Sequence, residues 1–313
     1  MNVAVIDVGT NTVLLLIAAV DAGGNITTIV YEQRAPRLGA GVDASRNLDP
    51  ASIDRVVTVL LEYHAIISAY RPLKTLVCAT SAVRDAGNKE EFLGIVKERT
   101  GFEIEILSGD DEAIWTYRGA LSGMQSIEKA TVIDIGGGST EIAVGDRYRI
   151  HSRISLDIGA VRLTERAFKH NPPTHPELEK AIEIVENEIE RVARFPLDGS
   201  TLVGVAGTAT SLAILDQGLK DFSREAVAGY RLNLENVYSL FRLLRGMHAE
   251  QILSLSTAMA GRADIIAAGS LILREIMAHL KFKELIVSER GVRYGVVLRE
   301  WERAGNAMPA SAS

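Results

Sequence analysis

The sequence contains little cysteine, because Cys78 is the one thiol among 313 residues. One thiol excludes intrachain disulfides and metal sites built from several cysteines, so nothing in the chain requires an oxidising compartment. Cys78 lies in the apolar run 73–79, which is typical of a buried strand thiol without a chemical role. We therefore expect a cytoplasmic protein.

Positive charge is also scarce, since 34 Lys and Arg residues stand against 40 Asp and Glu residues and the formal charge is −6. Binding to nucleic acid or to an anionic membrane needs a basic face that displaces counterions. The sequence therefore argues against nucleic acid and membrane as partners. A polyanionic substrate would have to be bound by local groups.

Long hydrophobic segments and two common catalytic patterns are absent as well. The apolar N-terminus has no basic first segment, and Asp7, Asn11 and Asp21 interrupt it well short of a membrane span. The chain shows neither a Walker A pattern nor the G-x-S-x-G pattern of serine hydrolases. We therefore expect strands at the N-terminus, and covalent serine chemistry loses support.

What the chain does contain is the composition of a folded α/β protein. Hydrophobic residues make up 47% and charged residues 24%, which suffices for one or two cores, and the length favours two domains. Hydrophobic periodicity and turn residues predict the positions of strands and helices. In the first half we expect strands at 3–7, 13–20, 26–31, 73–79 and 102–107, the first three antiparallel, and helices at 50–69, 89–99 and 110–122. In the second half we expect strands from 130 and at 141–146, 147–155, 201–206 and 284–288, and helices at 160–169, 177–193, 208–217, 234–246, 263–280 and 293–303.

A repeat connects the two halves. Residues 5–18, VIDVGTNTVLLLIA, align with residues 132–145, VIDIGGGSTEIAVG, at a constant offset of 127 positions (134 − 7). Asp7 then aligns with Asp134, and each is followed by a glycine turn. We therefore expect a duplicated strand–turn–strand unit at the start of both halves.

The glycine turn at 136–138 has a chemical interpretation. It follows a buried strand, so the Asp134 carboxylate lies at the strand end and backbone N–H groups can approach phosphate oxygens. The segment by itself would fit a simple hairpin equally well. Its repetition at Asp7 favours two carboxylates facing one cleft, where a divalent cation can bridge them to a phosphate.

Further candidates follow other strand ends, where ligands commonly bind in α/β sheets. Arg84 is a candidate phosphate clamp, and the alternative is an arginine paired with Asp85 or Glu112. Acids in the first turn of the helix at 110–122 ordinarily complement the helix dipole. Gly207 and Thr208 form another strand-to-helix turn, which fits either phosphate binding or close packing. The roles of Arg262, Arg290 and Arg293 stay open.

These motifs, taken in order, resemble the exopolyphosphatase / guanosine pentaphosphate phosphohydrolase family in its short two-domain form. The resemblance covers nearly the whole chain. It implies an α/β protein of two actin-like (ribonuclease H-like) domains, 1–124 and 125–303, with an interdomain active-site cleft. Residues 304–313 are expected to form a flexible tail. The segments that carry the resemblance are DVGTNT (7–12), ATSAVRDAGN (79–88), LSGDDEA (107–113), VIDIGGGSTE (132–141), IGAVRLTER (158–166), GTATSLA (207–213), GRADII (261–266) and SERGVRYG (288–295).

The same resemblance implies roles for individual residues. Glu112, in the Ser-Gly-x-x-Glu-Ala segment, is similar to a catalytic base, and Asp134 and Glu141 are similar to ligands of Mg²⁺ or another divalent cation. The residues expected to bind substrate phosphates are Asp7, Gly9, Thr10, Asn11, Thr12, Arg84, Gly136, Gly137, Gly138, Ser139, Gly207 and Thr208.

Three positions depart from the family pattern. Thr12 stands where serine is usual and keeps the hydroxyl, Leu14 stands where a basic residue is frequent, and Tyr294 replaces a commonly acidic residue. The chain also ends before the extra helical domain of longer members, which puts processive action on long polyphosphate in doubt.

The expected function is hydrolysis of the terminal phosphoanhydride of inorganic polyphosphate, which releases orthophosphate. The alternative is removal of the 5′-phosphate of guanosine pentaphosphate (pppGpp), and more distant alternatives are a superfamily kinase and a non-catalytic phosphate-ligand sensor. A homodimer is an open expectation. Phosphoryl transfer requires mainly positioning and neutralisation of oxygen charge, which a divalent cation, backbone N–H groups and an arginine can provide.

Overall fold

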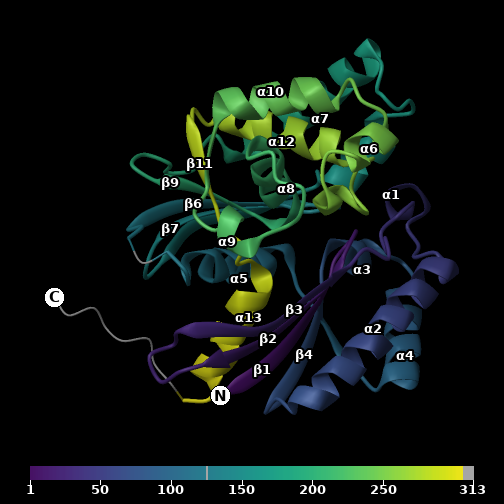
Figure 1. Ribbon diagram of the computed structural model, residues 1–313, viewed down its shortest axis with the longest axis vertical. Coiled ribbons are helices and arrows are strands. Elements are labelled where there is room, and N and C mark those ends of the chain that lie inside the picture. The colour runs from purple at the N-terminus through teal and green to yellow at the C-terminus, as the bar shows by residue number, and fades with distance from the viewer. Residues whose placement is uncertain (125, 306–313) are drawn as a thin grey trace. The chain divides into compact units, whose positions relative to one another are not determined.

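The computed structural model describes residues 1–124 and 126–305 (Figure 1), and the chain divides into two compact units. Unit 1 comprises Met1–Gly123 together with the C-terminal segment that starts at Arg290. Unit 2 comprises Met124–Glu289. The predicted flexible tail, 304–313, lies outside the described residues from position 306 onward.

Unit 1 is built around one mixed sheet. Its strands are β1 (Asn2–Val8), β2 (Val13–Val20), β3 (Ile26–Arg34), β4 (Lys74–Ala79) and β5 (Ile104–Ile106), and its helices are α1 (Val42–Ser45), α2 (Pro50–Tyr70), α3 (Ser81–Asp85), α4 (Lys89–Thr100), α5 (Gly109–Leu121) and α13 (Val292–Arg303). The strand order is β3-β2-β1-β4-β5. The first three strands are antiparallel, as predicted, and β4 and β5 are parallel to β1 and β4.

Hydrophobic side chains cover both faces of this sheet, because successive strand residues point to opposite sides. On one face Ile6 and Leu15 belong to a core that includes α2 and α4. On the other face Val5 and Leu16 belong to a core that includes α13. Cys78 is buried in β4, as predicted.

The position of α13 corrects the predicted second domain, 125–303, because this helix packs in unit 1. Trp301 is buried, and its Nε1 donates to the Asp21 carbonyl at 3.0 Å. A Cβ at Gly295 would lie 1.8 Å from the Trp115 carbonyl oxygen, so this glycine lets α13 approach α5 closely. The Tyr294 hydroxyl lies 2.8 Å from the hydroxyl oxygen of Thr28 on β3. These tertiary contacts have no signal in the local sequence pattern.

Unit 2 is built around a second mixed sheet. Its strands are β6 (Lys129–Ile135), β7 (Thr140–Asp146), β8 (Ile150–Leu156), β9 (Thr201–Val205), β10 (Arg231–Asn233) and β11 (Glu284–Val287), and its helices are α6 (Ala160–Ala167), α7 (His175–Ile189), the short η1 (Glu190–Val192), α8 (Ala206–Asp216), α9 (Arg224–Val227), α10 (Leu234–Leu244), α11 (Ala249–Leu253), the short η2 (Thr257–Met259) and α12 (Ile266–His279). The strand order is β10-β11-β9-β6-β7-β8. Helices α7, α10 and α12 lie on one face of this sheet and share its main core (Figure 1). The short elements α3, α9, β10 and α11 were not predicted, since each is too brief to show a period.

The duplication predicted from the sequence extends to the strand register. In both units the first strand of the repeat pairs antiparallel with the second and parallel with the strand that follows a helical crossover. The equivalent pairs are Asp7–Leu14 with Asp134–Glu141, and Val3–Lys74 with Ala130–Thr201. Every member differs from its counterpart by 127 positions (134 − 7, 141 − 14, 130 − 3, 201 − 74). The two sheets are therefore copies of one core.

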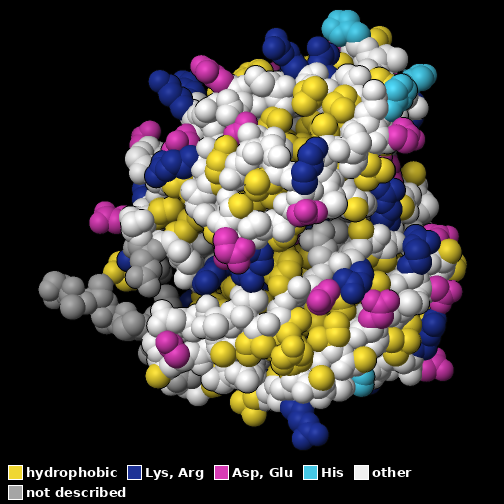
Figure 2. Space-filling view, viewed as in Figure 1, with side chains coloured by type: hydrophobic (Ala, Val, Ile, Leu, Met, Phe, Trp, Pro, Cys, Tyr) yellow, Lys and Arg dark blue, Asp and Glu magenta, His cyan; other side chains and the backbone are white. Residues whose placement is uncertain are grey.

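The surface agrees with the charge balance of the sequence. On the face drawn in Figure 2, Lys and Arg side chains alternate with Asp and Glu side chains over the described residues, without a continuous basic area. None of the helices within 1–124 and 126–305 is long and apolar enough to cross a membrane.

Candidate active site

The turn between β1 and β2 is held by the loop that follows β3. Gly9 N donates to the Thr12 carbonyl at 2.9 Å and closes the turn, and the Thr10 carbonyl accepts from Gly39 N at 2.8 Å. In a trans peptide the N–H points opposite to the carbonyl of the same peptide unit, so the Asn11 N–H points away from Gly39. That the turn binds phosphate stays a prediction.

Asp7 is the next-to-last residue of β1 and is buried, with 8% of its surface exposed. Its Oδ1 has no hydrogen-bond partner among the described residues. Burial raises the pKa of Asp7 to about 7, while the Arg293 guanidinium lowers it and the Glu112 carboxylate raises it further. Asp7 is therefore a carboxyl group that gains and loses its proton near neutral pH.

Glu112 lies in the first turn of α5, where Ser108 caps the helix by accepting from Asp111 N at 3.1 Å. The Glu112 side chain is buried, and its Oε2 accepts from Arg84 Nη1 at 2.8 Å. Arg84 Nη1 also donates to the Leu107 carbonyl at 3.1 Å. Burial raises the pKa of Glu112, and the neighbouring Arg84 opposes that rise.

The structure therefore shows the pairing that was one of the two alternatives for Arg84. Its Nη1 contacts Glu112, and its Nε lies 3.9 Å from Asp85 Oδ1. Because the side chain of Arg84 is 22% exposed, it is a partly buried group with a surface open to solvent. Its role as a phosphate clamp stays a prediction.

The turn between β6 and β7 repeats the geometry of the first turn in unit 2. Gly136 N donates to the Ser139 carbonyl at 3.0 Å. The carbonyls of Gly136 and Gly137 accept from backbone N–H groups of the first residues of α6 at 2.9 and 2.8 Å. By the same peptide geometry the N–H groups of Gly137 and Gly138 point away from α6.

Gly159, just before α6, is a residue for which no role was predicted. A Cβ at this position would lie 2.5 Å from the Gly137 carbonyl oxygen, so a larger residue would push the glycine turn away from the helix. The segment IGAVRLTER did carry the family resemblance, and its glycine was the available signal.

Asp134 and Glu141 stand directly opposite each other on β6 and β7. Side chains of directly opposite residues lie on one face of a sheet with their Cβ atoms about 4.5–5.5 Å apart. Glu141 is 2% exposed, and its Oε1 accepts from the Ser155 hydroxyl at 2.7 Å. The pair thus supplies two carboxylates from a rigid hairpin.

This donor set fits Mg²⁺ in combination with a substrate. Within residues 1–124 and 126–305, no group of three or more His, Cys, Asp or Glu side chains forms a metal cage. Mg²⁺ usually binds proteins through one or two carboxylates and completes its coordination with water and substrate phosphates. Two opposed carboxylates beside a glycine turn meet that requirement.

The turn between β9 and α8 contains the remaining predicted phosphate residues. Ala206 has a φ of 61°, an uncommon conformation for a residue with a Cβ. The Thr208 hydroxyl donates to the Ile135 carbonyl at 3.2 Å, and the Gly207 carbonyl accepts from Arg262 Nη1 at 2.8 Å. The turn is therefore attached to the end of β6 and to Arg262.

Contacts also locate the three arginines whose roles the sequence left open. Arg262 supports the Gly207 turn, and Arg290 donates to the Ser122 hydroxyl at 3.2 Å. Arg293 is buried, donates to the Leu15 carbonyl at 3.3 Å and lies over the ring of Tyr31. Arg293 belongs to the SERGVRYG segment, and its positive charge lowers the pKa of Asp7, which is a predicted site residue.

Unit 1 thus groups Asp7, Glu112 and Arg84 with the turn at 9–12, and unit 2 groups Asp134 and Glu141 with the turn at 136–139. The expectation that Asp7 and Asp134 face one cleft stays a prediction.

Known proteins resemble this chain over nearly its whole length. The profile of the Ppx/GppA phosphatase family matches residues 16–304. Exopolyphosphatase 2 of Mycobacterium tuberculosis is 35% identical over 95% of this chain and 98% of its own length. The guanosine-5′-triphosphate,3′-diphosphate pyrophosphatase of Photobacterium profundum is 26% identical over 94% of this chain and 58% of its own length.

A solved structure matches the fold as well. The crystal structure of the Aquifex aeolicus member of the Ppx/GppA family superposes with a TM-score of 0.82 and 32% identity, covering 98% of this chain and 99% of the other. The predicted architecture of two related actin-like α/β units is confirmed by this likeness. The match of the family profile to most of the sequence shows that the chain belongs to the Ppx/GppA phosphatase family.

Proposed function

We propose that this protein is an exopolyphosphatase that hydrolyses the terminal phosphoanhydride of inorganic polyphosphate and releases orthophosphate. The observation that carries the proposal is the ion pair between the buried Glu112 carboxylate and the partly buried Arg84 at the N-terminus of α5. A buried carboxylate with a raised pKa is a better proton acceptor near neutral pH than an exposed one. The 35% identity to an exopolyphosphatase supports the same substrate.

In this proposal Glu112 orients the attacking water and accepts its proton. The water oxygen forms a bond to the terminal phosphorus while the bond to the bridging oxygen breaks, and that oxygen leaves with the shortened chain. Arg84 keeps the Glu112 carboxylate ionised and pointed in one direction, since its Nη1 is also tied to the Leu107 carbonyl. Its other guanidinium nitrogens are the groups that would contact the terminal phosphate.

The glycine turns at 9–12, 136–139 and 207–208 would bind phosphate oxygens through backbone N–H groups. Asp7 fits beside a phosphate because its raised pKa keeps part of its population protonated at neutral pH. A protonated carboxyl group donates a hydrogen bond to a phosphate oxygen, whereas an ionised one would repel it.

Asp134 and Glu141 would hold a divalent cation such as Mg²⁺. A bound cation of this kind neutralises negative charge on phosphate oxygens. The Ser155 hydroxyl fixes one Glu141 oxygen, which supports an ordered ligand.

Hydrolysis of guanosine pentaphosphate is the second candidate, which the likeness to the pyrophosphatase of Photobacterium profundum supports. A side-by-side assay of phosphate release from polyphosphate, guanosine pentaphosphate and ATP, with Mg²⁺ and with excess EDTA, tests both candidates. We expect polyphosphate to be hydrolysed fastest and only with Mg²⁺. The absence of phosphate release from all three would contradict the proposal. A cytoplasmic location and a homodimer are further proposals, which fractionation and light scattering test.

A further inference from the structure

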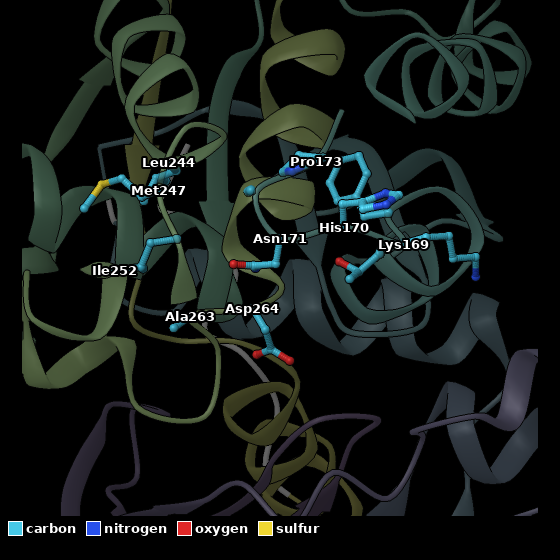
Figure 3. Close-up of a pocket in the computed structure, with 12 residues that line it drawn as sticks. Lys169, His170, Asn171, Pro173, Leu244, Met247, Ile252, Ala263 and Asp264 are labelled. Carbon is cyan, nitrogen blue, oxygen red and sulfur yellow. The ribbon is translucent and has the colours of Figure 1, made fainter. Parts of the chain in front are cut away.

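A cavity of about 160 Å³ lies in unit 2, among the loop after α6, the end of α10, α11 and the start of α12 (Figure 3). Its polar lining includes His170, Asn171 and Asp264, and each of the three already has an interaction partner within the protein. His170 Nδ1 lies 2.9 Å from Glu177 Oε1, and Asn171 Oδ1 accepts from Ala249 N at 3.0 Å. A ligand in this cavity would therefore add little to the hydrogen bonding of these groups.

Unit 1 contains a buried hydroxyl group that differs in this respect. Ser81 is 2% exposed, and its Oγ has no hydrogen-bond partner among the described residues. A buried hydroxyl that has lost its hydrogen bonds to water without gaining others destabilises the folded protein. Such groups are rare in folded proteins, so the Ser81 hydroxyl indicates a partner that the folded chain itself does not supply.

Ser81 lies at the same edge of the unit 1 sheet as Asp7. The strands β1 and β4 are parallel neighbours in which Val8 stands opposite Ala79. Asp7 is the residue before Val8, and its buried Oδ1 also has no hydrogen-bond partner among the described residues. Ser81 is the second residue after Ala79. Two unpaired buried atoms thus follow the carboxyl ends of adjacent parallel strands, where α/β sheets usually bind their ligands.

The position of Ser81 on α3 directs it toward the proposed base. Ser81 is the first residue of α3, and Arg84, three positions later, is its neighbour on the same helical face. Arg84 Nη1 donates to Glu112 Oε2 at 2.8 Å. The side chain of Thr80, the residue before Ser81, is also hydrogen-bonded to Glu112. Ser81 therefore lies between two residues that contact Glu112.

The residue after Ser81 lies beside the glycine turn at 9–12. A Cβ atom at Gly39 would be 3.1 Å from the Cβ atoms of both Ala82 and Thr10, so these two residues lie close together around Gly39. The chain thus places Ser81 next to the turn that we propose to bind phosphate.

The charges at this sheet edge favour an anion over a cation as the partner of Ser81. The Glu112 carboxylate is paired with Arg84, and the Arg293 guanidinium lowers the pKa of Asp7. Each acid is thus opposed by a positive charge, so a further cation gains little at this edge. A serine hydroxyl can donate a hydrogen bond to a phosphate oxygen, and so can Asp7 in its protonated form.

We propose that Ser81 is a further substrate-binding residue, whose hydroxyl donates a hydrogen bond to an oxygen of the terminal phosphate at the turn of residues 9–12. This inference rests on the proposed function in one respect, namely that this turn binds phosphate. The hydroxyl has its partner only while the substrate is bound. Loss of the hydroxyl therefore has opposite effects on the stability of the free protein and on binding.

The test is Ser81→Ala, which removes the hydroxyl and little else. The melting temperature of the ligand-free protein should rise by about 2 °C or more, because an unpaired buried group is removed. The KM for polyphosphate should rise about 10-fold or more with kcat little changed, since a hydrogen bond to a charged oxygen is lost from the substrate complex and from the transition state alike.

Ser52→Ala is the matched control. Ser52 is also 2% exposed and also lies in the first turn of a helix, α2. Its Oγ has partners, because it donates to Asp49 Oδ2 at 3.2 Å and accepts from Arg55 Nη2 at 2.6 Å. Ser52→Ala should therefore lower the melting temperature and leave the KM for polyphosphate unchanged.

Binding of orthophosphate, measured by calorimetry, gives a second readout that needs no turnover. The Kd for orthophosphate should rise about 10-fold in Ser81→Ala and stay unchanged in Ser52→Ala. A lower melting temperature of Ser81→Ala would show that the hydroxyl has a partner inside the protein and would overturn the inference. A higher melting temperature with unchanged KM and unchanged Kd would overturn it as well.

The calorimetric result also separates this inference from the proposed function. Weaker binding of orthophosphate by Ser81→Ala, in a protein that hydrolyses no polyphosphate, would support the role of Ser81 and refute the exopolyphosphatase proposal. Polyphosphate hydrolysis with a KM and an orthophosphate affinity that do not depend on Ser81 would do the reverse.

Discussion

The two glycine turns share one backbone and differ in the residue opposite the aspartate. Asp7 pairs with Leu14 on β2, and Asp134 pairs with Glu141 on β7, at the same place in the repeat. Both turns are closed by an equivalent hydrogen bond, of 2.9 Å in unit 1 and 3.0 Å in unit 2. One copy therefore offers a single carboxyl group and the other offers two.

In the proposed reaction, the two copies of the scaffold would have different tasks. In unit 2 both carboxylates come from a hairpin, which suits a cation that needs fixed ligands. In unit 1 the second carboxylate, Glu112, comes from α5 and is paired with Arg84. In unit 1, burial favours the protonated form of Asp7 by raising its pKa, which Arg293 lowers and the Glu112 carboxylate raises further.

Removal of the divalent cation should have the largest effect and tests the proposed role of the two carboxylates in unit 2. Excess EDTA should lower phosphate release by about 10³-fold, because neutralisation of phosphate charge by a cation contributes several kcal/mol. Glu141→Gln should raise the Mg²⁺ concentration needed for half-maximal activity, while Asp146→Asn on the same strand should not. Full activity in EDTA would remove Asp134 and Glu141 from the ligand role.

Glu112→Gln should have the next largest effect and tests unit 1. This change keeps the shape and removes proton acceptance, so kcat should fall by about 10²-fold or more with KM little changed. Thermal stability should stay nearly constant, because an amide oxygen at this position can still accept the hydrogen bond from Arg84 Nη1. Asp110→Asn, in the same helical turn, is the control and should keep normal turnover.

The opposite pattern would assign Glu112 to the helix dipole. In that case Glu112→Gln would cost about 0.3–1 kcal/mol of stability and leave phosphate release unchanged under saturating polyphosphate and Mg²⁺. That pattern would end the assignment of Glu112 as the base.

The sequence predicted the parts of the fold that are local or repeated. The β1–β2 and β6–β7 hairpins could be predicted because their alternation and glycine turns are visible within a few residues, and their common offset revealed the duplication. The position of α13 could not be predicted, because it depends on the contact of Gly295 with Trp115, 180 positions away (295 − 115).

The candidate site shows the same limit. The residue types at Glu112 and Arg84 were visible, and their pairing was one of two open alternatives until the structure placed them 2.8 Å apart. The support of the glycine turn by Gly159 and the cavity beside Asp264 depend on how α6, α10 and α12 pack. Packing between distant segments leaves no local pattern.

Asp7→Asn tests the single carboxyl group of the unit 1 turn through the pH dependence of stability. In the unfolded chain an aspartate titrates near 3.8, and in the folded protein Asp7 titrates near 7, so between these values the folded state holds one more proton. Stability therefore falls as pH rises from about 4 to about 7, by an amount on the order of a few kcal/mol. Asp7→Asn should remove that decrease.

The measurement is chemical denaturation of the wild type and the variant from pH 4 to pH 8 in the absence of divalent cation. The variant should be the more stable protein at pH 8 and should match the wild type near pH 4. Parallel stability curves would show that Asp7 keeps an ordinary pKa. Asp146→Asn, an exposed carboxylate whose pKa is lowered by backbone hydrogen bonds, should instead lose stability at pH 8.

The smallest effect concerns the supports of the two turns, which differ in kind. A Cβ at Gly159 would lie 2.5 Å from a backbone oxygen of Gly137, whereas a Cβ at Gly39 would lie 2.3 Å from the side-chain methyl of Thr10. A side chain can rotate away more easily than a backbone turn bonded to a helix can move.

Gly159→Ala should therefore cost about 1–3 kcal/mol of unfolding free energy and weaken Mg²⁺-dependent activity, and Gly39→Ala should cost less. Gly94→Ala, in α4 with open space around it, should stabilise the protein by about 0.5–1 kcal/mol. If Gly159→Ala and Gly39→Ala lower the unfolding free energy by the same amount, both turns can move equally easily. The distinction between a turn supported by a helix and a turn supported by a loop would then be wrong.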